Sequence, residues 1–224
     1  MSSLLLLNGS PRGARSNTTR MLARIVEGWQ EAGGDEPVVL HLTKPDEFRR
    51  AVAEFESAET VLLGMPLYVD SMPALVAEYI EALEPLAARE GNPRMGFLVQ
   101  SGFPEAVHSR GLERYLEKLT RRLGSPYAGT IVRGGGEALQ MMPDDALGNL
   151  FGMLGELGTQ LAEQGGFAQA TLDRVARFER CSPLSAAAKS VLFKVPVTQF
   201  YWNGQLKKNG AWNRRFDAPY GPAA

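Results

Sequence analysis

Short polar side chains gather in one glycine-containing segment, residues 8–18, directly after the first apolar run of the chain. Short side-chain donors that follow Gly9 in this segment are Ser10, Ser16, Asn17 and Thr18. Hydroxyl and amide groups bind anions when they stand beside the unpaired backbone N–H groups at the start of a helix, where the helix dipole adds partial positive charge. Gly9 and Gly13 permit the tight turns that such a loop needs. We therefore predict that this segment binds a phosphate group.

The spacing in this segment excludes two common nucleotide-binding loops. It lacks the Gly-x-Gly-x-x-Gly of dinucleotide folds and the Gly-Lys-Ser/Thr of nucleotide triphosphatases. A hydroxyl-rich loop without that lysine suits a terminal monophosphate. The alternative is a plain helix cap, in which Ser16 or Asn17 only accepts from backbone N–H groups. A cap needs one such residue, and the segment has four.

A parallel sheet flanked by helices must position this segment, because short apolar runs alternate with longer amphipathic segments. The expected strands are residues 4–7, 38–42, 60–65, 94–100 and 127–132. The expected helices are residues 18–32, 46–56, 73–88, 109–123 and 144–164. Most of the strands are apolar without alternation, as is typical of strands covered on both faces. These elements predict a doubly wound three-layer α/β domain that ends near Gly165.

Further loops leave the same edge of the predicted sheet, because the carboxyl ends of parallel strands lie together and ligands bind there. Residues 66–73 follow the third strand and hold Tyr68 between two prolines, which restrict the backbone. Residues 101–105 follow the fourth strand. Residues 134–136, all glycine, follow the fifth, where they allow close approach of a ligand or form a plain turn.

The first loop resembles a known family. Its sequence Leu-Asn-Gly-Ser-Pro-Arg, followed by Ser-Asn-Thr, is similar to the opening signature of the NADPH-dependent FMN reductase-like branch of the flavodoxin-fold NAD(P)H oxidoreductases. The Pro-Leu-Tyr stretch with its following Met-Pro, and the Gly-Phe-Pro-Glu turn, also resemble this branch. The resemblance covers residues 1–137 and implies a flavodoxin-like three-layer sandwich, with a five-stranded parallel sheet in the order 2-1-3-4-5.

The resemblance also implies an FMN site made of three loops. The phosphate ligands that it implies are Ser10, Arg12, Ser16, Asn17 and Thr18. The residues that it places along the isoalloxazine ring are Pro66, Leu67, Tyr68, Val69, Asp70, Ser101, Gly102 and Phe103. Tyr68 would stack on the flavin or face the nicotinamide, unless it is only a half-buried loop residue. Ser101 and Gly102 would offer backbone donors, and Phe103 an apolar wall.

The resemblance also implies that the protein is an enzyme. FMN would accept hydride from NADPH or NADH and pass electrons to a quinone, a free flavin or a nitro or azo compound. The flavin carries this chemistry, so no catalytic side chain is assigned, and Glu105 with His108 is interpreted as a solvated pair. The alternatives are a flavodoxin-type electron carrier and a non-catalytic flavin-binding sensor. Members of the family are obligate dimers, so we expect a homodimer or homotetramer.

Composition excludes several other classes of protein. The net charge of −1 does not call for a nucleic-acid partner, and no run of apolar residues is long enough to span a membrane. Cys181 is the only cysteine and the two histidines lie far apart, so we expect neither a disulfide nor a metal site. The N-terminus lacks the marks of an export signal. We expect a cytoplasmic protein.

The last part of the chain is interpreted as an appendage. We expect residues 1–165 to form the FMN-binding domain and residues 166–224 a C-terminal extension. Helices are expected at residues 168–180 and 182–193, with irregular, aromatic chain from Phe200 onward. The segment from residue 165 carries nine Lys and Arg against three Asp and Glu. Aromatic residues among basic ones are also found at nucleic-acid or membrane contacts, but an arm packed on the domain or on a dimer partner is commoner.

Overall fold

The computed structural model describes residues 3–182 and 200–217. The chain divides into two compact units, Met1–Arg180 and Cys181–Ala224. The first unit holds the sheet and extends beyond Gly165, the end expected for the FMN-binding domain. The packing of residues 181–224 on this domain or on a dimer partner stays a prediction.

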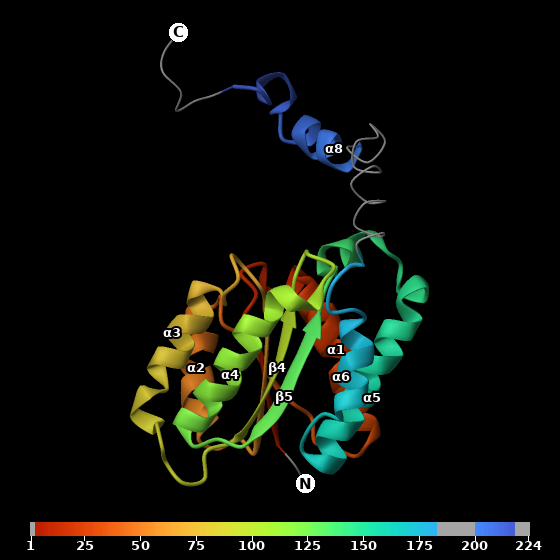
Figure 1. Ribbon diagram of the computed structural model, residues 1–224. Helices are drawn as coiled ribbons and strands as arrows, with labels where there is room; N and C mark the ends of the chain where they lie inside the picture. The colour runs from red at the N-terminus through yellow and green to blue at the C-terminus, as the bar shows by residue number, and fades with distance from the viewer. Residues whose placement is uncertain (1–2, 183–199, 218–224) are drawn as a thin grey trace. The chain divides into compact units, whose positions relative to one another are not determined.

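A five-stranded parallel sheet forms the centre of the first unit (Figure 1). Its strands pair in the order β2-β1-β3-β4-β5, which confirms the predicted fold class. Every residue of β1 and β3 is buried, as their uninterrupted apolar runs predict. The strands are β1 Leu4–Asn8, β2 Val38–His41, β3 Thr60–Pro66, β4 Arg94–Gln100 and β5 Tyr127–Arg133.

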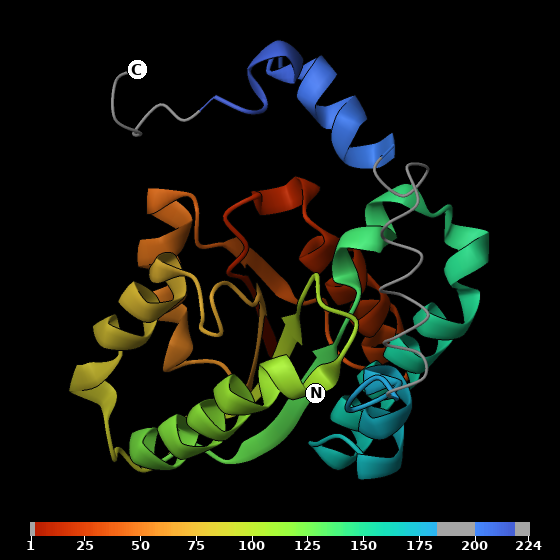
Figure 2. The ribbon, with the colours of Figure 1, turned by 45° about the horizontal axis from the view of Figure 1, so that its top comes forward.

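Helices cover both faces of the sheet (Figure 1). One face packs against α2 Pro45–Phe55, α3 Ala74–Ala82 and α4 Arg110–Leu123. The other packs against α1 Asn17–Glu31, α5 Gly148–Gln164 and α6 Gln169–Ala176. The loops at the carboxyl ends of β4 and β5 lie at the upper edge of the first unit in Figure 1, and Figure 2 turns this edge forward.

Two expected helices are shorter in the structure. The helix expected at residues 73–88 ends at Ala82 and is followed by a separate 3₁₀ turn, Glu84–Leu86. Pro85 explains the difference, because proline lacks an N–H and clashes with the preceding helical turn. The helix expected at residues 144–164 begins as a 3₁₀ turn, Asp144–Leu147, and is α-helical from Gly148.

The segment after Gly165 differs from expectation in part. α6 ends at Ala176 rather than at residue 180. The helix expected at residues 182–193 lies outside the described residues. The prediction of irregular chain from Phe200 was wrong, because α8 Phe200–Lys208 is helical and is followed by the 3₁₀ turn Trp212–Arg214. Two lysines in the last turn of α8 complement the helix dipole.

Basic and aromatic side chains of the second unit contact each other. The guanidinium of Arg215 lies 4.0 Å from the ring centroid of Trp212 and 4.6 Å from that of Phe216. Such cation–π contacts account for part of the aromatic and basic pattern of this segment within its own unit.

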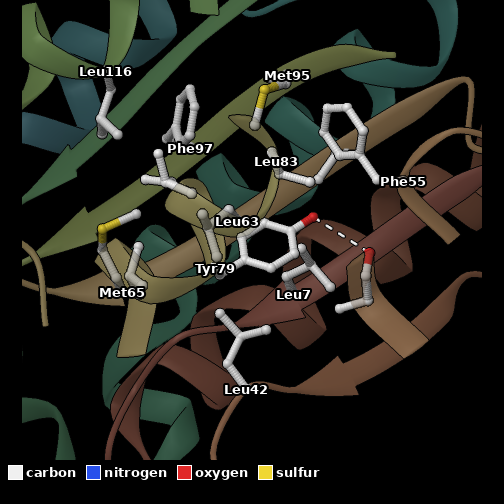
Figure 3. Packing of buried hydrophobic residues seen from close by; sticks show 14 of the residues in the cluster. Leu7, Leu42, Phe55, Leu63, Met65, Tyr79, Leu83, Met95, Phe97 and Leu116 are labelled. Carbon is white, nitrogen blue, oxygen red and sulfur yellow. Dashed lines mark hydrogen bonds between the residues drawn. The ribbon is translucent and has the colours of Figure 1, made fainter. Parts of the chain in front are cut away.

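Tyr79 lies at the centre of the core between the sheet and α2–α4 (Figure 3). Burial of its phenol raises its pKa well above the usual value. The hydroxyl donates to the Ala51 carbonyl over 3.5 Å, the upper limit for a hydrogen bond. Because this bond is long, we expect Tyr79→Phe to change the free energy of unfolding by less than about 1 kcal/mol. Urea unfolding tests this, and a loss above about 3 kcal/mol would show that the hydroxyl is essential.

α1 and α5 approach each other through glycines. A Cβ atom at Gly28 would overlap the carbonyl oxygen of Gly155, and one at Gly158 would overlap that of Ile25. The Thr159 hydroxyl donates to the Gly28 carbonyl over 3.1 Å. The two backbones are therefore in direct contact, which fixes the position of α1 and of the loop that precedes it.

Phe167 covers two glycines of the sheet. Its ring lies against Gly96 of β4 and Gly129 of β5, where added Cβ atoms would stand 3.2 and 3.0 Å from ring carbons. The Phe167 amide donates to the Ala128 carbonyl over 3.0 Å. The pairing of β4 with β5 shifts register at this point, between Met95 and Gly96.

Candidate functional site

Asn8, the last residue of β1, organises the loop that follows it. Its side chain is 2% exposed. Its Nδ2 lies within donating distance of three acceptors, Thr19 Oγ1 at 2.7 Å, the Gly13 carbonyl at 3.3 Å and Ser16 Oγ at 3.4 Å. Its Oδ1 accepts from the Ser10 amide over 2.9 Å. The loop is therefore folded around one buried amide, a role that the sequence analysis did not assign to Asn8.

The start of α1 combines a helix cap with unsatisfied polar atoms. Ser16 is the N-cap, and its Oγ accepts from the Thr19 amide over 3.1 Å, so the capping interpretation holds for this residue. Asn17 and Thr18 are buried, and Asn17 Oδ1 and Thr18 Oγ1 have no hydrogen-bond partner among the described residues. Buried polar atoms without a partner are costly; the Thr18 hydroxyl is able to donate, whereas Asn17 Oδ1 only accepts.

The predicted loops meet at a small cavity, which has a volume of about 50 Å³. It is lined by Ser10, Arg12, Ser16, Asn17, Pro66, Leu67, Tyr68, Gln100, Gly102 and Glu137. Eight of these were predicted from the sequence, whereas Gln100 and Glu137 were missed. Thr18, Val69, Asp70, Ser101 and Phe103 were predicted but do not line it. The cavity suits one small anionic group rather than a whole nucleotide.

Arg12 and Glu137 form an ion pair beside this cavity. Arg12 Nη1 and Nη2 donate to the two carboxylate oxygens of Glu137 over 3.2 and 3.3 Å. The two side chains are 50% and 46% exposed. Asn17 makes a second link to the same segment, because its Nδ2 donates to the Gly136 carbonyl over 2.7 Å. The loop after β5, which the sequence left open as a ligand contact or a plain turn, thus holds the first loop.

We expect Glu137→Gln to strengthen the binding of an anion in this cavity. The change removes a negative charge from the cavity and releases the Arg12 guanidinium from its ion pair with Glu137. Because the pair is half exposed, the gain should be small, about threefold in affinity at low salt and less at high salt. Titration with FMN at two salt concentrations measures it. Glu90→Gln, on the exposed loop before β4, is the control. Weaker binding by Glu137→Gln alone would show that the pair supports the loop.

The loop after β3 makes a tight two-residue turn. The amides and carbonyls of Tyr68 and Ser71 exchange hydrogen bonds of 2.9 and 3.0 Å. Val69 and Asp70 between them have φ of +49° and +60°. A β-branched residue such as Val69 is strained in this region, and its side chain is 99% exposed. Val69 and Asp70 therefore stand at the tip of the turn, whereas Pro66, Leu67 and Tyr68 face the cavity.

The loop after β4 uses some of the groups that were expected to be free. The Ser101 amide donates to the Arg133 carbonyl over 3.0 Å, so it is not the backbone donor that was expected. The Ser101 hydroxyl donates to the Phe103 carbonyl over 3.0 Å. Phe103 is 58% exposed and stacks on His108, with ring centroids 4.4 Å apart. His108 lies 3.5 Å from the Glu105 carboxylate on the protein surface.

No helix within residues 3–182 and 200–217 has the length and apolar character to cross a membrane. No cluster of three or more His, Cys, Asp or Glu residues within the same ranges is arranged to hold a metal ion.

The sequence matches the model of one protein family, described as the flavodoxin-like fold, over residues 2–123. No curated protein matches the chain.

Several solved structures share its fold. An FMN-dependent NADH-azoreductase from Bacillus anthracis, in complex with FMN, is 16% identical with a TM-score of 0.56, over 73% of this chain and 100% of its own. An NAD(P)H:quinone oxidoreductase from Methanothermobacter marburgensis is 18% identical with a TM-score of 0.55, over 71% and 96%. An NADPH-quinone reductase from P. pentosaceus is 18% identical with a TM-score of 0.52, over 72% and 98%. At these identities the likeness shows the fold.

Proposed function

Because the chain belongs to the flavodoxin-like fold family, we propose that it is an FMN-dependent oxidoreductase that passes electrons from NADPH or NADH to a small acceptor. The acceptor would be a quinone, a free flavin or a nitro or azo compound. The similar structures support this proposal, since their names describe NAD(P)H-dependent azoreductases and quinone reductases. The proposal includes a homodimer or homotetramer in the cytoplasm.

One observation carries the proposal, the small cavity at the amino end of α1, which is lined by the hydroxyls of Ser10 and Ser16 and by Arg12. A hydroxyl there can donate to a phosphate oxygen, and the helix dipole favours the negative charge. Ser10, Arg12 and Ser16 have side chains that can donate, whereas the buried Thr18 hydroxyl lies outside the lining. These residues fit the phosphate of FMN, and no lysine is present among them for a longer phosphate chain.

The residues of this chain would bind and orient the cofactor. Asn8 holds the phosphate loop in shape, and Arg12 adds positive charge at its mouth. Pro66, Leu67 and Tyr68 would line the ring system, with Tyr68 44% exposed and therefore accessible to a second ring. FMN, when bound, supplies the hydride-accepting chemistry, while the protein supplies orientation and electrostatics.

Ser10→Ala tests the carrying observation, because it removes a hydroxyl donor that lines the cavity. We expect about a tenfold or greater loss of FMN affinity, as for a hydrogen bond to a charged group, and no loss of riboflavin affinity. Quenching of flavin fluorescence measures both ligands. Equal binding of FMN and riboflavin by the original protein would overturn the phosphate site.

The redox function has its own test. The FMN-loaded protein should lose its yellow colour with NADPH or NADH under anaerobic conditions and regain it when a quinone is added. Slow reduction by both nicotinamides would favour the electron carrier. Binding of FMN with no turnover would favour the sensor.

A further inference from the structure

A second, larger cavity lies beyond the carboxyl end of β5. Its volume is about 570 Å³, within the range of small-molecule sites. Its lining shares no residue with that of the small cavity. Leu139, Leu147 and Leu150 give it apolar walls, and all three are buried. A molecule with an apolar body would therefore find a suitable surface here.

The charges around this cavity have one sign. Arg133, Arg174 and Arg177 line it, and no aspartate or glutamate does. Arg174 has a carboxylate partner outside the lining, since its Nη2 lies within hydrogen-bond distance of Glu156. A hydrogen bond positions Arg133, and a turn of the backbone positions Arg177.

Arg133 is a buried guanidinium with an unsatisfied donor. The residue is 8% exposed. Its Nη1 donates to the Val175 carbonyl over 3.0 Å, whereas its Nε is buried without a hydrogen-bond partner among the described residues. Burial, and then the charge of Arg177, lower its pKa to about 10, so it still carries its proton at neutral pH. A buried charge that lacks a counter-charge is costly, and an anion would relieve that cost.

Arg177 is held by a strained turn at the end of α6. Its φ and ψ are +68° and −71°, and the Phe178 amide donates to the Ala176 carbonyl over 3.0 Å. These are the features of a γ-turn with positive φ, which is rare because it is strained. The following residues are tied down, because the Ala106 amide donates to the Phe178 carbonyl over 3.2 Å. The fold thus places the backbone of a second arginine beside the cavity at a cost in strain.

We propose that this cavity is a second ligand site, for an organic anion that has a carboxylate or phosphate head and an apolar or aromatic body. Arg133 and Arg177 bind the head, as guanidinium groups do with planar and tetrahedral anions. The leucine walls bind the body. The site is independent of the proposed FMN site and does not require FMN to be bound.

Isothermal titration calorimetry with three naphthalene probes tests the proposal on the full chain. 2-Naphthoate and 1-naphthyl phosphate carry the two head groups, and 2-naphthamide is the uncharged control. We expect one or both anions to bind at least about tenfold more tightly than the amide, and the better anion identifies the head group. Saturating FMN should leave this affinity unchanged. Equal binding of all three probes, no binding of any, or competition with FMN would overturn the proposal.

Variants assign the binding to this cavity. Arg177→Gln removes the exposed guanidinium, and Arg133→Met removes the buried one. Each variant should bind the better of the two anions at least about tenfold more weakly than the original protein does. Arg180→Gln removes an equal charge three residues further along and outside the lining, and should change the affinity less than about twofold. Arg177→Gln keeps the test valid if Arg133→Met does not fold. An unchanged affinity in Arg177→Gln would refute the site.

Discussion

Asn8→Asp is expected to lower the free energy of unfolding by about 2–4 kcal/mol at pH 7 and to weaken FMN binding at least about thirtyfold. Aspartate keeps the acceptor for the Ser10 amide but loses the Nδ2 donor to Thr19, Ser16 and Gly13. Its buried charge would face a carbonyl oxygen, and a bound phosphate would be repelled. Urea unfolding and FMN titration measure the two effects.

The pH dependence of this variant separates the charge from the lost donor. Burial without a cation raises the pKa of a carboxyl above its unfolded value, so the added loss of stability appears as pH rises through the unfolded pKa of about 3.9. The variant should therefore be closer to the original protein at pH 4 than at pH 7. Asn213→Asp, an exposed position in the second unit, is the control. If Asn8→Asp were as harmless as this control, Asn8 would not organise the loop.

Gly158→Val is expected to lower the free energy of unfolding by about 3 kcal/mol or more. A Cβ at residue 158 overlaps the Ile25 carbonyl oxygen, and the next nearest residue is reached at the Trp29 backbone nitrogen. Both are backbone atoms, so the overlap cannot be relieved by moving a flexible side chain. The backbones of α1 and α5 would have to separate. At about 2–4 °C per kcal/mol for a chain of this size, the melting temperature should fall by roughly 6 °C or more.

Gly152→Ala is a matched control on the same helix, and its effect should have the opposite sign. Nothing lies within 4 Å of a Cβ at Gly152, so only the helix propensity changes, which favours alanine by about 0.5–1 kcal/mol. Calorimetry of both variants checks the pair. Similar losses in both would mean that α5 is sensitive to any side chain, and not that α1 and α5 touch at Gly158.

The fold was predictable because burial on both faces leaves a direct mark in the sequence. β1 and β3 are unbroken apolar runs, and the glycines after α1 end its apolar stripe. The order of the strands came from the resemblance and was confirmed. The wrong end of α3 came from reading apolar periodicity through Pro85 without the penalty that proline carries.

The site was predictable in its location but not in its contacts. The loop ends meet as expected, because parallel strands place their carboxyl ends at one edge. Glu137 was missed because its partner, Arg12, lies 125 residues away in the sequence. Asn8 had a detectable signal, a polar residue at the end of a fully buried strand. The γ-turn at Arg177 left no signal in the sequence, because arginine is not typical of positive φ.

The position of the Phe167 ring makes residues 96 and 167 depend on each other. A methyl group at Gly96 would push against the ring, whereas a smaller residue in place of Phe167 would leave Gly96 uncovered on the face of the sheet. Gly129 is different, because its φ of +118° strains any side chain there whatever lies above it. Related sequences should therefore exchange residues 96 and 167 together, with a larger residue on the strand wherever the aromatic ring is lost, and keep glycine at position 129.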